Sequence, residues 1–431
     1  MPDCFSGIFY PYFIFEDESM TETYDLIVRN ALLRGAAAPT DIAVSGGKIA
    51  KLGAKLAGSA AKELDARGNL VTESFVNTHL HLCKVYTLMM MDEAALKDYQ
   101  GADMGKAMTA IELAARVKEK YDEKWIIKNV RRVLALAGRY GCTHIRAFAD
   151  VDSKGKLEGV KALLKAREEF KGIVDVQVVA FAQDGVVREP GTEKLMREAM
   201  KMGADVVGGI PWIEYTDADI AEHVRFCFEL AREYNKPVSM LVDDAGDPGL
   251  RSIEVMALET IKIGWQGRSL AHHARAMSMY PKPYLQKLAA LLKKAEMGVV
   301  SDPHTGPLHA RVRELQEENV LVCLGQDDIS DAYYPYGRNN MLEVAFLNSH
   351  LLWYTTREDM ETLYDMVTKN AAKCIGVKDH EIKAGAPANF VVLDQPNTLE
   401  ALRFHERPVY VISHGKLVDQ AAMDKIYEEN K

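Results

Sequence analysis

Apolar and polar residues alternate near both ends of the chain, and this alternation of period two is typical of strands with one face on a core. Tight turns are expected at Gly46-Gly47 and at His414-Gly415. We therefore expect a small β-sandwich domain, residues 23–72 plus 380–431, to which both chain ends contribute. The short strands that the pattern predicts there are at residues 24–30, 41–52, 62–65, 389–393, 408–413 and 416–418.

The middle of the chain, residues 73–379, carries apolar strand-like runs that alternate with helical patterns of period near 3.6. The strand-like runs are at 69–76, 143–150, 174–183, 205–211, 237–244, 269–273, 298–302 and 320–327. Helical patterns are at 112–140, 156–170, 192–202, 217–234, 249–263, 283–295, 310–318 and 357–374. This alternation predicts an α/β fold, a (β/α)8 TIM barrel, in which functional residues lie at the carboxyl ends of the strands.

Composition narrows the class of partner. A net charge of −9 over 431 residues argues against a nucleic-acid or anionic-membrane partner, so we expect a small-molecule substrate. We find no apolar run near the ~18 residues of a membrane span. Six scattered cysteines without a CxxC pair favour a cytoplasmic protein. The aromatic-rich residues 1–22 lack the basic start of a signal peptide, and we expect an arm that is disordered or packs on a neighbour in a homo-oligomer.

Two histidines stand one residue apart at the end of the first barrel strand. Residues i and i+2 of a strand point the same way, so His79 and His81 present two imidazoles together, which is half of a divalent-metal site. An isolated pair of this kind is often one core histidine and one loop residue, but other strand ends here are also polar. They are Gln183-Asp184, Trp212-Ile213-Glu214, Asp243-Asp244, His272-His273, Asp302-Pro303-His304 and Gln326-Asp327-Asp328.

Several of these residues also have simpler structural interpretations. Asp327 could cap the following helix, His273 could be a core histidine and Gln183 could cap a loop. Trp212 and Tyr333 are expected only as a lining of the pocket.

The motifs around these strand ends resemble the metal-dependent amidohydrolase superfamily, in its cytosine deaminase and N-isopropylammelide amidohydrolase branch. The resemblance covers about residues 24–420. Its specific parts are FVNTHLHLCK, VVAFAQDG, GADVVGGIPWIEYT, LAHHARAM, CLGQDDISDAYYPYGRNNML and KAGAPANFVVLD.

The resemblance implies one divalent ion per chain, Zn²⁺ or Fe²⁺, with His79, His81 and Asp327 among its ligands. It also implies that His273 faces the attacking water and that Gln183 binds the heterocycle. Asp244 falls at the position of the catalytic glutamate. The fourth strand ends in Ile210-Pro211-Trp212 without the lysine of binuclear members, so one metal ion is expected.

Three positions depart from the pattern of the family. Leu241 replaces a metal-binding histidine on the fifth strand, Phe148 replaces a histidine on the second and Cys83 replaces an aspartate. Asp243, two residues after Leu241, is our expected fourth ligand, because a carboxylate is an acceptable ligand for either metal. The alternatives for this position are His272, His273 and Cys83.

The function that we expect is hydrolysis by metal-activated water. Asp244 would move the proton, His273 and Asp327 would assist it, and Gln183, Trp212, Tyr333 and Phe148 would frame a flat substrate. A deaminase of an aminated N-heterocycle or cyclic amidine is the first hypothesis. The alternatives are a hydrolase of cyclic or acyclic amides and a metal-free homologue that only binds a ligand.

Overall fold

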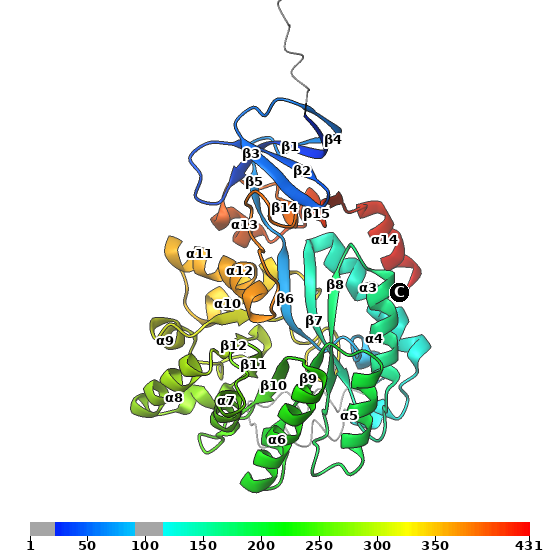
Figure 1. Ribbon diagram of the computed structural model, residues 1–431, viewed down its shortest axis with the longest axis vertical. Coiled ribbons are helices and arrows are strands. Elements are labelled where there is room, and N and C mark those ends of the chain that lie inside the picture. Colours follow the sequence, from blue (N-terminus) through cyan, green and yellow to red (C-terminus); the bar gives the residue numbers. More distant parts are fainter. Residues whose placement is uncertain (1–21, 91–114) are drawn as a thin grey trace, which may run out of the picture.

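The computed structural model describes residues 22–90 and 115–431, which form a small sheet domain above a barrel (Figure 1). The expected arm, residues 1–22, therefore lies outside the described residues except for its last position. None of the helices in the described ranges has both the length and the apolar character needed to span a membrane.

Both ends of the chain build the small domain, as predicted. Its eight strands run in the order β16-β15-β14-β5-β1-β2-β3, with β4 paired to β1. Side chains from both ends share one apolar core, in which Val28 and Ile42 pack with Phe390 and Ile412. The strands are β1 (Thr23–Leu33), β2 (Thr40–Ser45), β3 (Lys48–Gly53), β4 (Ser59–Asp65), β5 (Leu70–Glu73), β14 (Phe390–Val392), β15 (Tyr410–Ser413) and β16 (Lys416–Leu417).

Eight parallel strands form the barrel, and they follow one another in chain order. A bridge between Leu80 and Asp327 closes the ring: the Asp327 amide donates to the His79 carbonyl at 2.9 Å, and the His81 amide donates to the Asp327 carbonyl at 2.8 Å. The TIM-barrel prediction is confirmed. The strands are β6 (Phe75–Leu80), β7 (Cys142–Asp150), β8 (Asp175–Phe181), β9 (Val206–Gly209), β10 (Val238–Val242), β11 (Ser269–His273), β12 (Gly298–Ser301) and β13 (Val322–Leu324).

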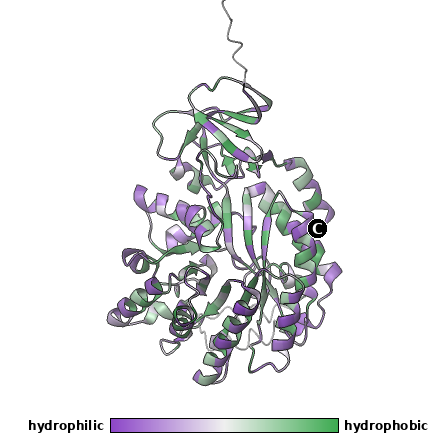
Figure 2. Cartoon of the chain, viewed as in Figure 1, coloured by the Kyte–Doolittle hydropathy of each residue, from purple (hydrophilic) through white to green (hydrophobic). Residues whose placement is uncertain are grey.

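Helices surround these apolar strands and turn their polar faces outward (Figure 2). The last helix packs on α3 of the barrel layer. The helices are α3 (Glu123–Tyr140), α4 (Glu158–Glu169), α5 (Thr192–Lys201), α6 (Asp217–Tyr234), α7 (Ser252–Lys262), α8 (Lys282–Lys294), α9 (Val312–Glu317), α10 (Met341–Leu351), α11 (Arg357–Met366), α12 (Lys369–Cys374), α13 (Thr398–Phe404) and α14 (Gln420–Glu429). Short 3-10 helices are η1 (Thr87–Met90), η3 (Pro211–Ile213), η4 (Arg275–Met279) and η5 (Pro303–Thr305).

Three predicted elements are divided in the structure. The run 69–76 becomes β5 and β6, because at Ser74 the chain leaves the small sheet for the barrel. The predicted helix 112–140 is interrupted before α3, whose amino end Asp122 caps by accepting from the Lys124 amide at 2.9 Å. The helix predicted at 357–374 divides into α11 and α12, since the Val367 carbonyl accepts from the Val76 amide instead of continuing the helix.

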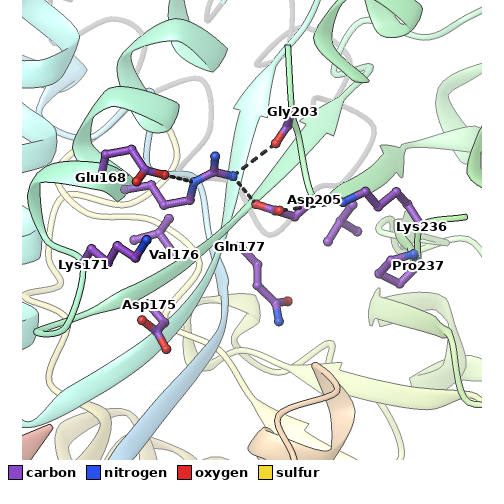
Figure 3. A pocket seen from close by; sticks show the side chains of 11 residues that line it. Glu168, Lys171, Asp175, Val176, Gln177, Gly203, Asp205, Lys236 and Pro237 are labelled. Atoms are coloured by element: carbon purple, nitrogen blue, oxygen red, sulfur yellow. Dashed lines mark hydrogen bonds and ion pairs between the residues drawn. The ribbon is translucent and has the colours of Figure 1, made fainter. Parts of the chain in front are cut away.

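The crossing at Ser74 sets the direction of the barrel. Strand β6 starts beside the small domain, so the carboxyl ends of all eight parallel strands lie at the far end (Figure 1). A pocket of about 580 Å³ lies at the opposite end, by the first residues of β8 and β9 (Figure 3). There Arg167 is paired with Asp205 and donates to the Gly203 carbonyl. This pocket is away from the strand ends at which barrel chemistry takes place.

Candidate active site

Four buried side chains converge at the carboxyl ends of the strands. His79, His81, His273 and Asp327 each offer one ligand atom, and these atoms lie within 4.8 Å of one another. Asp327 Oδ1 is 2.8 Å from His79 Nε2 and 3.5 Å from His81 Nε2. Asp327 Oδ2 is 3.9 Å from His273 Nδ1. The structure thus brings together the three ligands expected from the resemblance and one of the alternatives for the fourth.

The backbone explains this convergence. His79 is in β6 and points into the barrel, and the bridge between Leu80 and Asp327 places the aspartate beside it. Both His273 and Asp327 have positive φ angles, 67° and 68°, which are unusual for residues other than glycine. Such backbone strain is often found at functional sites, where the surrounding structure holds it in place.

The donor set fits a divalent transition metal. Three imidazole nitrogens and one carboxylate oxygen are typical ligands of Zn²⁺ and Fe²⁺. Burial raises the pKa of Asp327, and the neighbouring carboxylate of Asp328 raises it further. Burial also raises the pKa of Asp302, whose Oδ2 lies 3.3 Å from His273 Nδ1. A bound cation would offset this concentration of buried negative charge.

Asp243, the expected fourth ligand, lies outside this group among the described residues. Its Oδ1 accepts from the amide and the hydroxyl of Ser252 at 2.7 and 2.6 Å, and its Oδ2 accepts from the Ile253 amide and the Tyr280 hydroxyl at 3.2 Å each. The Asp243 carboxylate therefore anchors the start of α7. Its φ of 48° explains the difference, because the alternation of side chains holds only while the backbone is extended.

The alternative ligand Cys83 is also engaged elsewhere. Its thiol accepts from the Asp150 amide at 3.2 Å, and burial raises its pKa well above the usual value. Because metals bind the thiolate rather than the thiol, this environment disfavours Cys83 as a ligand. Of the alternatives for the fourth position, His273 is the one in the group of converging ligand atoms among the described residues.

Asp244 follows Asp243 and lies close enough to His79 for the two side chains to interact electrostatically. Its Oδ1 is 2.8 Å from Arg275 Nε, and both side chains are largely buried. Burial raises the pKa of Asp244 to about 6, against the lowering effect of Arg275. A carboxylate with a pKa near neutrality suits proton transfer. Arg275 was missed in the sequence, because no local pattern indicates that it pairs with another strand end.

Gln183 lies on the same rim in contact with a buried lysine. Lys84 Nζ donates to Gln183 Oε1 at 3.2 Å and lies 4.5 Å from the centre of the Tyr333 ring. Burial disfavours the charged lysine, but the carboxylates of Asp328 and Asp150 outweigh burial and raise its pKa. Lys84 was also missed, although it stands three residues after His81 in the strand-end motif.

Aromatic rings pack below the histidines. The Phe148 ring lies 4.4 Å from that of His79 and 5.3 Å from that of His81, and it is fully buried. Phe148 and Leu241 belong to one apolar cluster that also contains Trp212. Two of the three departures from the family pattern, Phe148 and Leu241, therefore belong to an apolar cluster that packs against the histidines.

A second group of buried charges joins two strand ends at this rim. Lys118 Nζ lies 2.7 Å from Asp184, 3.0 Å from Asp152 and 3.7 Å from Asp150. All four side chains are buried, and the carboxylates raise the pKa of Lys118 although burial opposes this. Because Asp184 follows Gln183 directly, the cluster fixes the backbone next to that amide.

Comparisons with known proteins agree with this geometry. Residues 120–419 match the model of the Amidohydrolase family. The chain is 31% identical to N-isopropylammelide isopropyl amidohydrolase of Pseudomonas sp. (strain ADP), over 93% of this chain and 98% of that one. The 5-methylcytosine deaminase of Klebsiella pneumoniae, solved with 5-fluorocytosine, is similar in structure with a TM-score of 0.84 and 29% identity, over 91% of this chain and 97% of that one.

A third similar protein is N-isopropylammelide isopropylaminohydrolase of Burkholderia multivorans. Its structure has a TM-score of 0.76 and 26% identity, over 91% of this chain and 97% of that one. The matches span nearly the whole barrel and the small domain.

Proposed function

Because this chain belongs to the amidohydrolase family and is therefore a hydrolase of carbon–nitrogen bonds, we propose that it removes an exocyclic amino or alkylamino group from an N-heterocycle. The observation that carries the proposal is the buried group of His79, His81, His273 and Asp327, together with the electrostatic interaction between Asp244 and His79. The Pseudomonas and Klebsiella relatives, which are named for an alkylamino heterocycle and an aminopyrimidine, support this class of substrate.

The four-residue group would hold one ion of Zn²⁺ or Fe²⁺. Such an ion lowers the pKa of a bound water from 15.7 to about 7, which supplies a nucleophile at neutral pH. His79, His81 and Asp327 provide three donors, and His273 provides the donor that Leu241 cannot.

We assign the proton transfer to Asp244. As a carboxylate it accepts a proton from the attacking water, and as an acid it donates that proton to the leaving nitrogen, which departs as ammonia or an amine. Arg275 keeps the carboxylate in place through its contact at 2.8 Å. The heterocyclic product keeps the oxygen of the water.

We assign recognition of the ring to Gln183 and Lys84. Lys84 Nζ donates to Gln183 Oε1 and so fixes the orientation of the Gln183 amide. The NH₂ group of that amide can then donate to a ring nitrogen or carbonyl of the substrate. Lys84 is itself a cation and favours acceptor atoms on the same edge. The ring of Tyr333, which lies against Lys84, provides a flat wall.

The experiment that tests the proposal is an assay of the ammonia or amine released from the substrate. Purified protein loaded with Zn²⁺ or Fe²⁺ is incubated with 5-methylcytosine, cytosine and N-isopropylammelide, and ammonia and isopropylamine are measured together with the ring product. We expect one equivalent of ammonia or amine for each ring that gains an oxygen. Metal-loaded protein that releases no nitrogen from any of these rings but cleaves an amide would contradict the proposed substrate class.

A further inference from the structure

His272 occupies the strand position next to Leu241 and faces the same side. In the pairing of β10 with β11, Leu241 lies opposite His272, and residues opposite each other in a sheet point to one face. His272 is fully buried, and its ring lies 5.2 Å from that of Phe148. The place beside the leucine, which has no donor atom, is thus taken by an imidazole from the neighbouring strand.

The partner of this imidazole is one of the metal-site histidines. His272 Nδ1 and His79 Nδ1 are 2.7 Å apart, which is a hydrogen bond that needs one proton between them. The other nitrogen of His79, Nε2, faces Asp327 Oδ1 at 2.8 Å. The contacts of His79 therefore assign its Nε2 to the metal group and its Nδ1 to His272.

The tautomers follow from this arrangement. With Nε2 of His79 bound to a cation, its proton must be on Nδ1, and His272 Nδ1 accepts it. His272 then carries its own proton on Nε2, a buried atom that makes no hydrogen bond within residues 22–90 and 115–431. Without a cation, His79 Nε2 can donate to Asp327 and the short hydrogen bond reverses. The bond persists in both states, and only its direction changes.

The geometry points to His272 as a positioning residue: it fixes the ring and tautomer of His79 and so sets metal affinity, without binding the metal itself. This inference rests on the proposed function. His272 is not in the group of converging ligands, and its Nδ1 is already engaged by His79. Partners of this kind, which hold a ligand histidine through its other nitrogen, commonly change metal affinity about 10–100-fold when they are replaced.

The test compares Co²⁺ and Zn²⁺ binding in wild-type protein, H272N, H272F and H272A. Affinity is measured by competition with a chelator, and the Co²⁺ absorption spectrum reports the number of ligands. Asparagine keeps an acceptor near the position of Nδ1, phenylalanine keeps a buried ring without an acceptor, and alanine provides a second variant without one. We expect about 10–100-fold weaker binding in H272F and H272A. H272N should bind nearly as tightly as wild type, and all should hold one ion with the same spectrum.

The other possible results distinguish failure of the positioning role from failure of the proposed function. Equal affinity in wild type, H272F and H272A would overturn the positioning role while leaving the metal site intact. A changed Co²⁺ spectrum or lost stoichiometry in all three variants would make His272 a ligand and also overturn it. Wild-type protein that binds neither ion would overturn this inference and the proposed function together.

Discussion

The D244N variant is expected to lose about 10²- to 10⁴-fold in kcat while it keeps its metal ion, because an amide cannot carry a proton from water to the leaving nitrogen. Asparagine has the same shape and retains an oxygen for Arg275, whose Nε lies 2.8 Å from Asp244 Oδ1. The loss should therefore appear in kcat rather than in folding or in metal content. Steady-state kinetics with metal analysis of the same samples measure both.

The pH dependence of kcat/KM is a second test of the role of Asp244. Burial raises the pKa of Asp244 to about 6, and the residue must be ionised to accept a proton. The value of kcat/KM should therefore rise as the pH increases through the pKa of Asp244 and level off at higher pH. The positive charge of a bound ion favours the carboxylate, so the rise should lie at or below pH 6.

The matched control is D247N, because Asp247 is an exposed residue three positions along the same loop. This variant should keep the activity and the profile of wild type. If D244N retains more than about a tenth of wild-type kcat, the loss is smaller than the smallest loss expected for a proton shuttle. That result would remove Asp244 from the mechanism.

The K118M variant is expected to lower the free energy of unfolding by about 3–5 kcal/mol, because it leaves buried carboxylates without their cation. Lys118 Nζ lies 2.7 Å from Asp184 and 3.0 Å from Asp152, and all three side chains are buried. Methionine preserves most of the volume of the lysine, so the loss reports charge rather than packing. Denaturant unfolding followed by circular dichroism measures it.

Lys120→Met is the control for this variant, since Lys120 is exposed two residues away. It should change the free energy of unfolding by no more than about 0.5 kcal/mol, as is usual for surface positions. A similar small effect for K118M would show that the three carboxylates do not depend on the lysine.

Periodicity in the sequence was sufficient to bring most of the candidate metal ligands to one rim of the barrel. His79 and His81 are two residues apart at a strand end, and the barrel rule places Asp327 at the same rim. The alternation of strands and helices also predicted the barrel and the two-ended small domain. These features depend on local patterns and on a general rule of the fold, so a single sequence contains them.

The fourth member of this candidate group could not be predicted in the same way. Asp243 was expected to face the metal because it is two residues after Leu241, but its φ of 48° ends the alternation and turns its carboxylate to the amino end of α7. At His273 a φ of 67° also ends the alternation, and its side chain joins the group of converging ligand atoms. Backbone conformation at a strand end is set by the loop that follows, which the strand pattern does not describe.

Side chains that act through distant partners were also missed. Lys84 reaches Gln183, which is 99 positions away, and Arg275 reaches Asp244 from η4, after the next strand. Each looks like an ordinary charged residue until the barrel brings its partner close. Only the tertiary structure identifies the contacts of Lys84 and Arg275 as parts of one site.

Elemental analysis of wild type, D327N and D243N, each purified without chelator, is the most direct test of the proposed metal ligands. We expect close to one Zn or Fe per chain in wild type, loss of that metal in D327N and retention in D243N, since asparagine can still accept from Ser252. Wild-type protein without metal, or metal lost from D243N and kept in D327N, would contradict the proposed ligand set.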